Sequence, residues 1–372
     1  MLQFLFFWRL DQEKWRDAII AMIEHFANES EKTLPFVLHI FGKGKYESQI
    51  LDLAKQYPAH IIYYGFQPLQ SIKKTATQYD YCLMPSLFLE TFWLSAVNAL
   101  SWWIPVIGYQ QWGMASFVLD NYNLWSNPGS PAVHLITMME KLFGQWSHND
   151  GKKCREIAEQ YNKKKWIQHF NTLAQSKSKK ILLVTDFVDR LGGIETYVHD
   201  VTALLTEQWH TVQIVWSSWW KTKIWRLFSM ALSICNIFFA RKLQKKINAF
   251  QPDIIWCHSV LRHIGRLWLR IINTSKAHKW MMYHDLWYIA PFPHSIYDEK
   301  DIAASLWWLD FSKNVSNPMQ KFLAFGKRCL IRLLWRQLKR FDVHLVPSQY
   351  MVDHIAKHID SSIIVLPHFI QQ

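Results

Sequence analysis

A carboxylate and an amide stand in the segment PSLFLETFWLSAVNALSWWIPVIG, which runs from Pro85 to Gly108. Glu90 lies directly before the helix that the apolar spacing predicts over 91–101, and Asn98 lies within that helix. Both side chains can hydrogen-bond a hydroxyl group, the carboxylate with the greater, charge-assisted strength. This strand–turn–helix segment is the strongest candidate in the chain for a site that does chemistry.

Further candidate residues follow other apolar runs, where predicted strands end. Arg9 and Lys14 follow FLFF, Gly42 follows FVLHIF, and His284 follows KWMMY. The pair Gly192-Gly193 lies in the turn after KKILLVTDF, and such a turn lets backbone N–H groups approach an anion. The sequence has no Walker A motif, no zinc-ligand spacing, no G-x-S-x-G and no paired catalytic cysteine and histidine.

Tryptophan stands where glycine is expected in several of these turns. The chain has 21 Trp and only 12 Gly, whereas an average composition of about 7% Gly would give about 26. Trp93 lies where a turn meets a helix and Trp103 where a helix ends, and glycine suits both places because it tolerates positive φ and close approach. The same pattern marks other positions, namely Trp8, Trp15, Trp112, Trp125, Trp209, Trp268 and Trp287. We interpret these tryptophans as glycines encoded by UGA; the alternative is a protein rich in aromatic residues.

The composition favours anionic partners. The net charge is +13 and the isoelectric point about 9.4, which suits sugar nucleotides, acidic lipid surfaces or nucleic acid. The five cysteines are scattered, with no C-x-x-C pair, which predicts reduced thiols and a cytoplasmic protein. The apolar start MLQFLFF runs into charged residues with no cleavage site, so it is interpreted as a buried strand.

Predicted strands and helices alternate along the whole chain. This alternation predicts an α/β fold of two Rossmann-like domains, each with a parallel sheet. The polar stretch QSKSKK predicts a linker over 175–180. It separates a first domain, 1–174, from a second, 181–372.

With glycine at positions 93 and 103, the segment from Pro85 to Gly108 resembles the donor-binding signature of retaining family 4 glycosyltransferases, which have the GT-B fold. FFWRLDQEKW and IFGKGKYESQI resemble two glycine turns of the same family. The resemblance implies that Arg9, Lys14 and Gly42 bind the donor diphosphate. It implies that Glu90 contacts the donor sugar. Asn98 takes the place of a glutamate that binds the ribose, which puts the nucleotide specificity in doubt.

The second half resembles the acceptor-side domain of the same family. DFVDRLGGIETYV resembles its glycine loop, which implies that Gly192 and Gly193 approach the diphosphate; a plain strand–helix turn is the alternative. In MMYHDLW, His284 takes the place of the family's active-site histidine. His258 is interpreted as a structural residue.

The resemblance implies a glycosyltransferase that moves a sugar, with retention, from a nucleotide-sugar donor to a hydroxyl of a glycan or lipid-linked acceptor. It implies cell-surface glycan synthesis, no cofactor, no obligatory metal and no nucleic-acid partner. Two alternatives stay open. One is an inactive fragment of a tandem glycosyltransferase, and the other is a nucleotide-sugar epimerase with the GT-B fold.

The order of the two domains is reversed relative to that family, whose acceptor-side domain comes first. One hypothesis is a slice of a tandem pair, in which Glu90 and His284 lie far apart. The other is a circular permutant, in which they converge on one cleft with Arg9 and Gly193. We favour the slice.

A basic, apolar segment lies near the end of the chain. Residues 314–341 contain no acidic residue and seven basic ones, interleaved with apolar residues at near-helical spacing. A peripheral contact with an anionic membrane, at the inner face, is one interpretation. A core-packing helix with a solvated basic face is the other.

Overall fold

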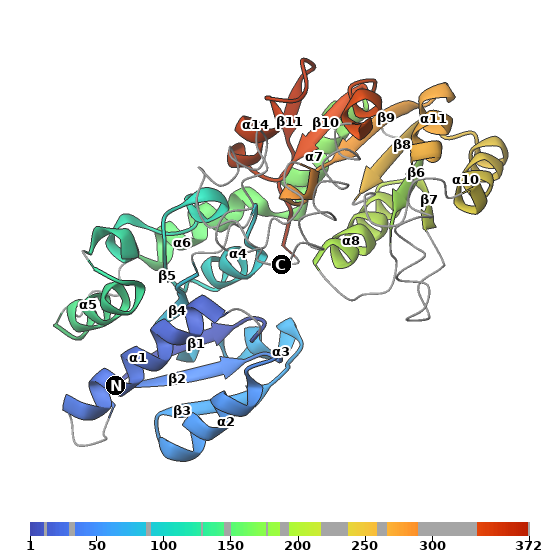
Figure 1. The fold of residues 1–372 in the computed structure, drawn as a ribbon. Coiled ribbons are helices and arrows are strands. Elements are labelled where there is room, and N and C mark those ends of the chain that lie inside the picture. Colours follow the sequence, from blue (N-terminus) through green and yellow to red (C-terminus); the bar gives the residue numbers. More distant parts are fainter. Residues whose placement is uncertain are drawn as a thin grey trace, which may run out of the picture. The chain divides into compact units, whose positions relative to one another are not determined.

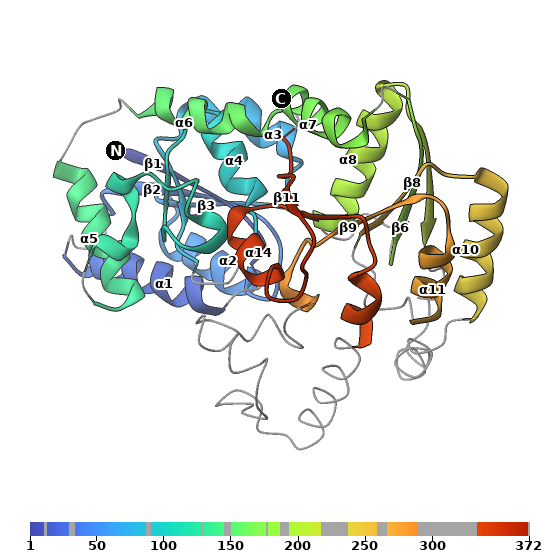
Figure 2. The same ribbon diagram turned by 90° about the horizontal axis from the view of Figure 1, so that it is seen from above.

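The computed structural model describes residues 1–10, 13–29, 34–86, 91–127, 129–144, 150–175, 178–186, 193–216, 237–258, 266–288 and 333–370. The chain divides into two compact units, each shown as a sheet with helices around it in Figures 1 and 2. Unit 1 comprises Met1–Asn162 and Phe369–Gln372, and unit 2 comprises Lys163–His368.

Unit 1 is built on a parallel sheet of five strands in the order β3-β2-β1-β4-β5. Its strands are β1 (Leu2–Phe7), β2 (Phe36–Phe41), β3 (Ile61–Gly65), β4 (Tyr81–Met84) and β5 (Val106–Gly108). Its helices are α1 (Glu13–Glu29), α2 (Glu47–Gln56), α3 (Leu69–Lys74), α4 (Leu94–Ser101), α5 (Pro131–Gly144) and α6 (Gly151–Ala158).

Unit 2 is built on a parallel sheet of six strands in the order β11-β10-β9-β8-β6-β7. Its strands are β6 (Lys180–Thr185), β7 (Thr211–Trp216), β8 (Ile254–His258), β9 (His278–Met282), β10 (Val343–Val346) and β11 (Ile363–Val365). Its helices are α7 (Lys163–Ala174), α8 (Gly193–Glu207), α10 (Ile237–Phe250), α11 (Arg266–Thr274) and α14 (Gln349–Ile355). The two parallel sheets confirm the predicted α/β class with two Rossmann-like domains.

Short 3₁₀ turns connect some of these elements. They are η1 (Ala76–Gln78), η2 (Trp112–Met114), η3 (Asp120–Tyr122), η4 (Leu124–Ser126), η5 (Glu159–Tyr161) and η6 (Leu286–Tyr288). The central strands are buried on both faces, as β2 and β8 show along their whole length. Such continuous burial explains their unbroken apolar runs, because helices cover both faces of a parallel sheet.

Helix α7 belongs to unit 2, although the sequence places the domain boundary after 174. Phe170 packs against the β8 residue Trp256 with ring centroids 5.5 Å apart, and against Trp280 of β9 at 5.4 Å. Trp166 stacks on Trp256 at 6.3 Å. These buried aromatic contacts place the division before α7, between Asn162 and Lys163. Lys180, at the end of the predicted linker, already belongs to β6.

Helix α4 ends in a left-handed residue that is tryptophan. The Ile104 N–H donates to the Ala99 carbonyl and the Trp103 N–H to the Leu100 carbonyl, each at 3.0 Å. This pair of bonds is the Schellman motif, whose left-handed residue is usually glycine. Trp103 occupies that position with a φ of 70°.

Helix α8 ends in the same way. The His210 N–H donates to the Leu205 carbonyl at 3.0 Å, and the Trp209 N–H donates to the Thr206 carbonyl at 3.2 Å. Trp209 has a φ of 68°, and Trp112, the first residue of η2, has a φ of 48°. Three of the tryptophans suspected from the sequence therefore have left-handed backbones.

Other suspected tryptophans have ordinary backbones. Trp93, at the N-cap of α4, has a φ of −116°. Trp268 lies inside α11 and is 1% exposed. These conformations do not require glycine.

The described end of the basic segment packs into unit 2. Leu334, Trp335, Leu338 and Phe341 are buried, and the rest of the segment, with Arg328 and Arg332, lies outside the described residues. Across the described parts of the chain, no helix is both long enough and apolar enough to span a bilayer.

Candidate functional site

The turn after β1 fits closely against the turn after β2 in unit 1. The Trp8 N–H donates to the Phe41 carbonyl at 3.1 Å, and the Leu10 N–H donates to the Lys43 carbonyl at 3.0 Å. Between them Gly42 has a φ of 149°, and a Cβ added there would lie 1.9 Å from the Trp8 carbonyl oxygen. The backbone therefore requires glycine at position 42, at the carboxyl edge where ligands bind in open α/β sheets.

Tyr63 fixes the same turn from the neighbouring strand. Its hydroxyl lies 2.8 Å from the Gly42 carbonyl and 2.8 Å from the Glu47 carboxylate. Burial, together with the carboxylate of Glu47, raises the pKa of Tyr63 to about 12. The Gly42 carbonyl is thus held by a neutral hydroxyl.

The two predicted cations differ in how they are placed. Arg9 is exposed directly after β1. Lys14 lies in the first turn of α1, but its side chain is outside the described residues. The hydrogen bonds of Trp8 and Leu10 place the backbone turn that contains Arg9 against the Gly42 turn, and the contact of Lys14 stays a prediction.

Two indole rings meet between the β1 turn and the start of α4. Trp8 and Trp93 have ring centroids 3.9 Å apart with the rings nearly perpendicular. Trp93 is 4% exposed, and its Nε1 has no hydrogen-bond partner among the residues that the structure describes. These rings fill the space between the two segments in which the family resemblance expects glycine.

Asn98 is occupied within its own helix. Asn98 is buried in α4, and its amide Nδ2 donates to the Leu94 carbonyl of its own helix at 2.8 Å. Glu90 lies outside the described residues, as does Gly192. Their donor roles stay predictions.

In unit 2, Gly193 begins α8, and a Cβ added to it would meet no atom of the described residues within 4 Å. Unlike Gly42, this glycine is not held in close contact by the part of the chain that the structure describes. The turn that precedes it, including Gly192, is not among the described residues.

His284 lies in a buried chain of three imidazoles at the carboxyl ends of β8, β9 and β11. His258 Nδ1 lies 2.9 Å from His284 Nε2, and His284 Nδ1 lies 3.1 Å from His368 Nε2. All three side chains are buried. Tyr197 of α8 stacks on His368 with centroids 4.2 Å apart.

Burial keeps these imidazoles neutral. Desolvation lowers the pKa of His258 to about 3 and that of His368 to about 3, and it lowers the pKa of His284 well below its usual value. The sequence singled out His284 and interpreted His258 as structural; it missed His368. The available signal was a histidine after a predicted strand, in VLPHF.

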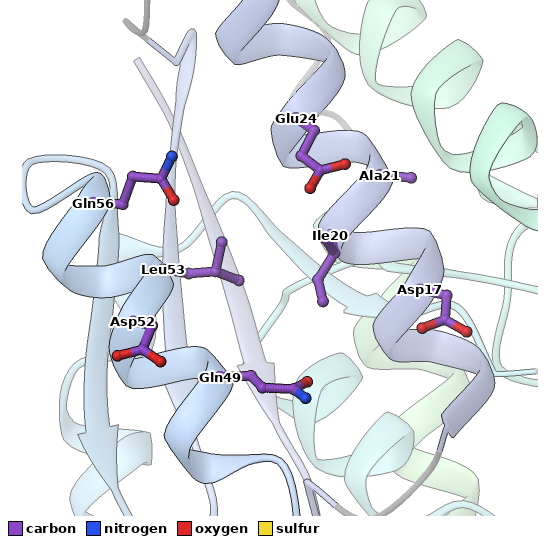
Figure 3. A pocket seen from close by; sticks show the side chains of 8 residues that line it. All are labelled: Asp17, Ile20, Ala21, Glu24, Gln49, Asp52, Leu53 and Gln56. Atoms are coloured by element: carbon purple, nitrogen blue, oxygen red, sulfur yellow. The ribbon is translucent and has the colours of Figure 1, made fainter.

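A separate groove of about 500 Å³ lies between α1 and α2 of unit 1. Figure 3 shows the side chains of the two helices that line it, which are Asp17, Ile20, Ala21, Glu24, Gln49, Asp52, Leu53 and Gln56. Three of these are carboxylates and none is basic, so the groove is unsuited to an anionic nucleotide.

Both halves of the chain match models of glycosyltransferase families. Residues 2–164 match the model "Glycosyl transferases group 1", and residues 191–371 match the model "Glycosyltransferase Family 4". No curated protein matches the chain.

Solved structures show partial likeness. The pneumococcal O-GlcNAc transferase GtfA, in complex with UDP and GlcNAc, is 18% identical over 47% of this chain and 35% of its own, with a TM-score of 0.38. The lipopolysaccharide outer core galactosyltransferase WaaB is 21% identical over 47% of this chain and 49% of its own, with a TM-score of 0.35. The catalytic domain of the Helicobacter pylori cholesterol-alpha-glucosyltransferase is 15% identical over 42% of this chain and 96% of its own, with a TM-score of 0.33.

The two family matches together cover most of the chain, and each lies mainly within one parallel α/β unit. Each half of the chain therefore belongs to a glycosyltransferase family, the first half to group 1 and the second half to family 4.

Proposed function

We propose that the protein transfers a sugar from a nucleotide-sugar donor to a hydroxyl of a glycan or lipid-linked acceptor, in the synthesis of cell-surface glycans. The observation that carries this proposal is the match of both halves to glycosyltransferase family models. The Gly42 turn supports it, because its close backbone approach lies at the carboxyl edge of the unit 1 sheet. Retention at the anomeric carbon, independence of a metal and location at the inner membrane face belong to the same proposal.

In this proposal the donor site lies mainly in unit 1. Arg9 and Lys14 neutralise the diphosphate as it leaves, and such charge stabilisation is strongest where it develops in the transition state. Glu90 contacts the donor sugar, Asn98 faces the nucleoside, and Gly42 gives the phosphates access to backbone N–H groups. In unit 2, Gly192 and Gly193 are the candidates for the same backbone access, and His284 is that unit's candidate catalytic residue.

We expect Arg9→Ala and Glu90→Ala each to lower sugar transfer at least tenfold, because each removes a charge directed at the donor. Incubation with a panel of nucleotide sugars, followed by mass spectrometry of released nucleotide and product, measures this. Arg241→Ala is the matched control, because Arg241 is exposed on α10 of unit 2. Transfer at the wild-type rate by both donor-site variants would contradict the assignment of the donor site.

The contact between Trp8 and Trp93 favours a second candidate, a glycosyltransferase-type protein that does not bind a donor. Two indoles with centroids 3.9 Å apart leave no room between the β1 turn and α4 for a diphosphate. This second candidate function applies if positions 8 and 93 are both tryptophan. If both positions are glycine, the proposed sugar transfer is favoured.

Replacement of both Trp8 and Trp93 by glycine should tighten UDP, ADP or GDP binding at least tenfold, because it opens the space that the rings fill. Isothermal titration of the full chain with each nucleotide measures the change. Trp125→Gly is the control, since Trp125 is 48% exposed and belongs to η4. Equal affinities of the double variant and the parent chain would show that the rings do not block a donor site.

A further inference from the structure

The three imidazoles of unit 2 form one continuous chain of hydrogen bonds. His258 Nδ1 meets His284 Nε2 at 2.9 Å, and His284 Nδ1 meets His368 Nε2 at 3.1 Å. His284, the middle ring, therefore uses both of its nitrogens within the chain. The aromatic rings of Trp256 and Tyr197 pack against its two ends, at 4.6 Å from His258 and 4.2 Å from His368.

Counting protons limits this chain to two states. A neutral imidazole has one N–H, and each gap between two rings holds one proton. If His258 is protonated at Nδ1, His284 must accept at Nε2 and donate from Nδ1, and His368 must then accept at Nε2. If His258 is protonated at Nε2, every assignment reverses. The rings are thus all Nδ1–H or all Nε2–H.

The unpartnered end of the chain selects between these states. His258 Nε2 is buried and has no hydrogen-bond partner among the described residues. The all-Nε2–H state would leave an N–H without an acceptor there, and buried N–H groups without an acceptor are rare. The all-Nδ1–H state leaves only a lone pair at that position.

We propose that His258 and His368 are positioning residues that hold His284 as its Nδ1–H tautomer. The geometry of the chain carries this proposal, and only the relevance of His284 to sugar transfer rests on the proposed function. A proton can leave or reach His284 only if both neighbouring rings change tautomer with it. His284 therefore offers a substrate a fixed ring and does not exchange a proton alone.

Nitrogen-15 NMR of the histidine-labelled full chain tests the proposal without any variant, because two-bond ¹⁵N–¹H couplings distinguish the two tautomers. We expect His258, His284 and His368 all to be Nδ1–H. His210 serves as an internal reference of the opposite kind. Its Nδ1 accepts the Lys179 N–H at 3.1 Å, so its proton is on Nε2. A His284 protonated at Nε2, or three rings with differing tautomers, would overturn the proposal.

A variant tests the coupling between the rings. His368→Phe keeps an aromatic ring against Tyr197 and removes the nitrogen that accepts from His284. We expect Nε2–H signals to appear at His284 and also at His258, because the hydrogen bond of His258 among the described residues is to His284. His210→Phe, the matched control, should leave all three tautomers unchanged. Unchanged His258 signals in the folded His368→Phe variant would refute the coupling.

The activity assay is independent of these spectra. If the protein does not transfer sugar but its three histidines are all Nδ1–H, the proposed function is wrong and the proposed tautomers of the three imidazoles are confirmed. If the protein transfers sugar but its three histidines have different tautomers, the proposed hydrogen-bonded arrangement is wrong and the proposed function is confirmed.

Discussion

Replacement of Gly42 by alanine should lower the free energy of unfolding of unit 1 by about 3 kcal/mol or more, because strain at a special backbone position is among the few causes of so large a loss. The added Cβ would lie 1.9 Å from the Trp8 carbonyl oxygen. That oxygen belongs to the backbone of a turn that is bonded on both sides of it, so it cannot move aside as a flexible side chain would. The turn after β1 and the turn after β2 would have to separate.

Thermal unfolding followed by circular dichroism measures this effect, with an expected fall in Tm on the order of 10 °C for a unit of this size. Gly193→Ala is the matched control, since a Cβ at Gly193 meets no atom within 4 Å among the residues that the structure describes. Alanine at the start of α8 should be neutral or slightly stabilising. Gly42→Ala and Gly193→Ala variants with equal Tm values would contradict the close approach.

The sequence predicts the fold well because strands and helices leave local signals. Buried parallel strands such as β2 consist of continuous apolar residues, and the helices between them have amphipathic spacing. The division between units was less predictable. QSKSKK has the composition of a linker, but Trp166 and Phe170 pack on β8, and no local signal reports which sheet a helix covers.

The candidate site could be predicted in part. Gly42 and His284 were found because each follows an apolar strand. The partnership of His284 with His258 and His368 was not predictable, because it joins residues 26 and 84 positions away in sequence. The three residues come together because β8, β9 and β11 are parallel strands of one sheet, so that their carboxyl ends lie at the same edge.

Replacement of both Trp103 and Trp209 by glycine should raise stability, by about 1 kcal/mol for each unit. A left-handed backbone costs a residue with a Cβ about 1–2 kcal/mol, and the greater freedom of glycine in the unfolded chain offsets part of the gain. The two rings are 56% and 85% exposed, so little burial is lost. Urea denaturation of the single variants measures each contribution, because Trp103 belongs to unit 1 and Trp209 to unit 2.

Trp268→Gly is the control, because we expect it to lower stability and not to raise it. Trp268 is 1% exposed inside α11, so glycine there leaves a cavity and weakens the helix, at a loss of about 3 kcal/mol or more. If Trp103→Gly and Trp209→Gly also destabilise the protein, the left-handed positions are adapted to tryptophan.

A stabilising effect would support the proposal that these tryptophan positions are glycine in the protein that the cell makes. Trp103 and Trp209 lie in Schellman motifs, in which glycine is the usual left-handed residue. A bulky exposed ring gains nothing there, while Trp8 and Trp93 fill the space of a predicted donor site. UGA codons at these positions and glycine in peptides of the native protein are the expected findings; UGG codons would show that the tryptophans are genuine. Glycine at 103 and 209 would relax the ends of two helices, and glycine at 8 and 93 would open the predicted donor site. Translation of UGA as glycine would therefore affect both the stability of the fold and its activity.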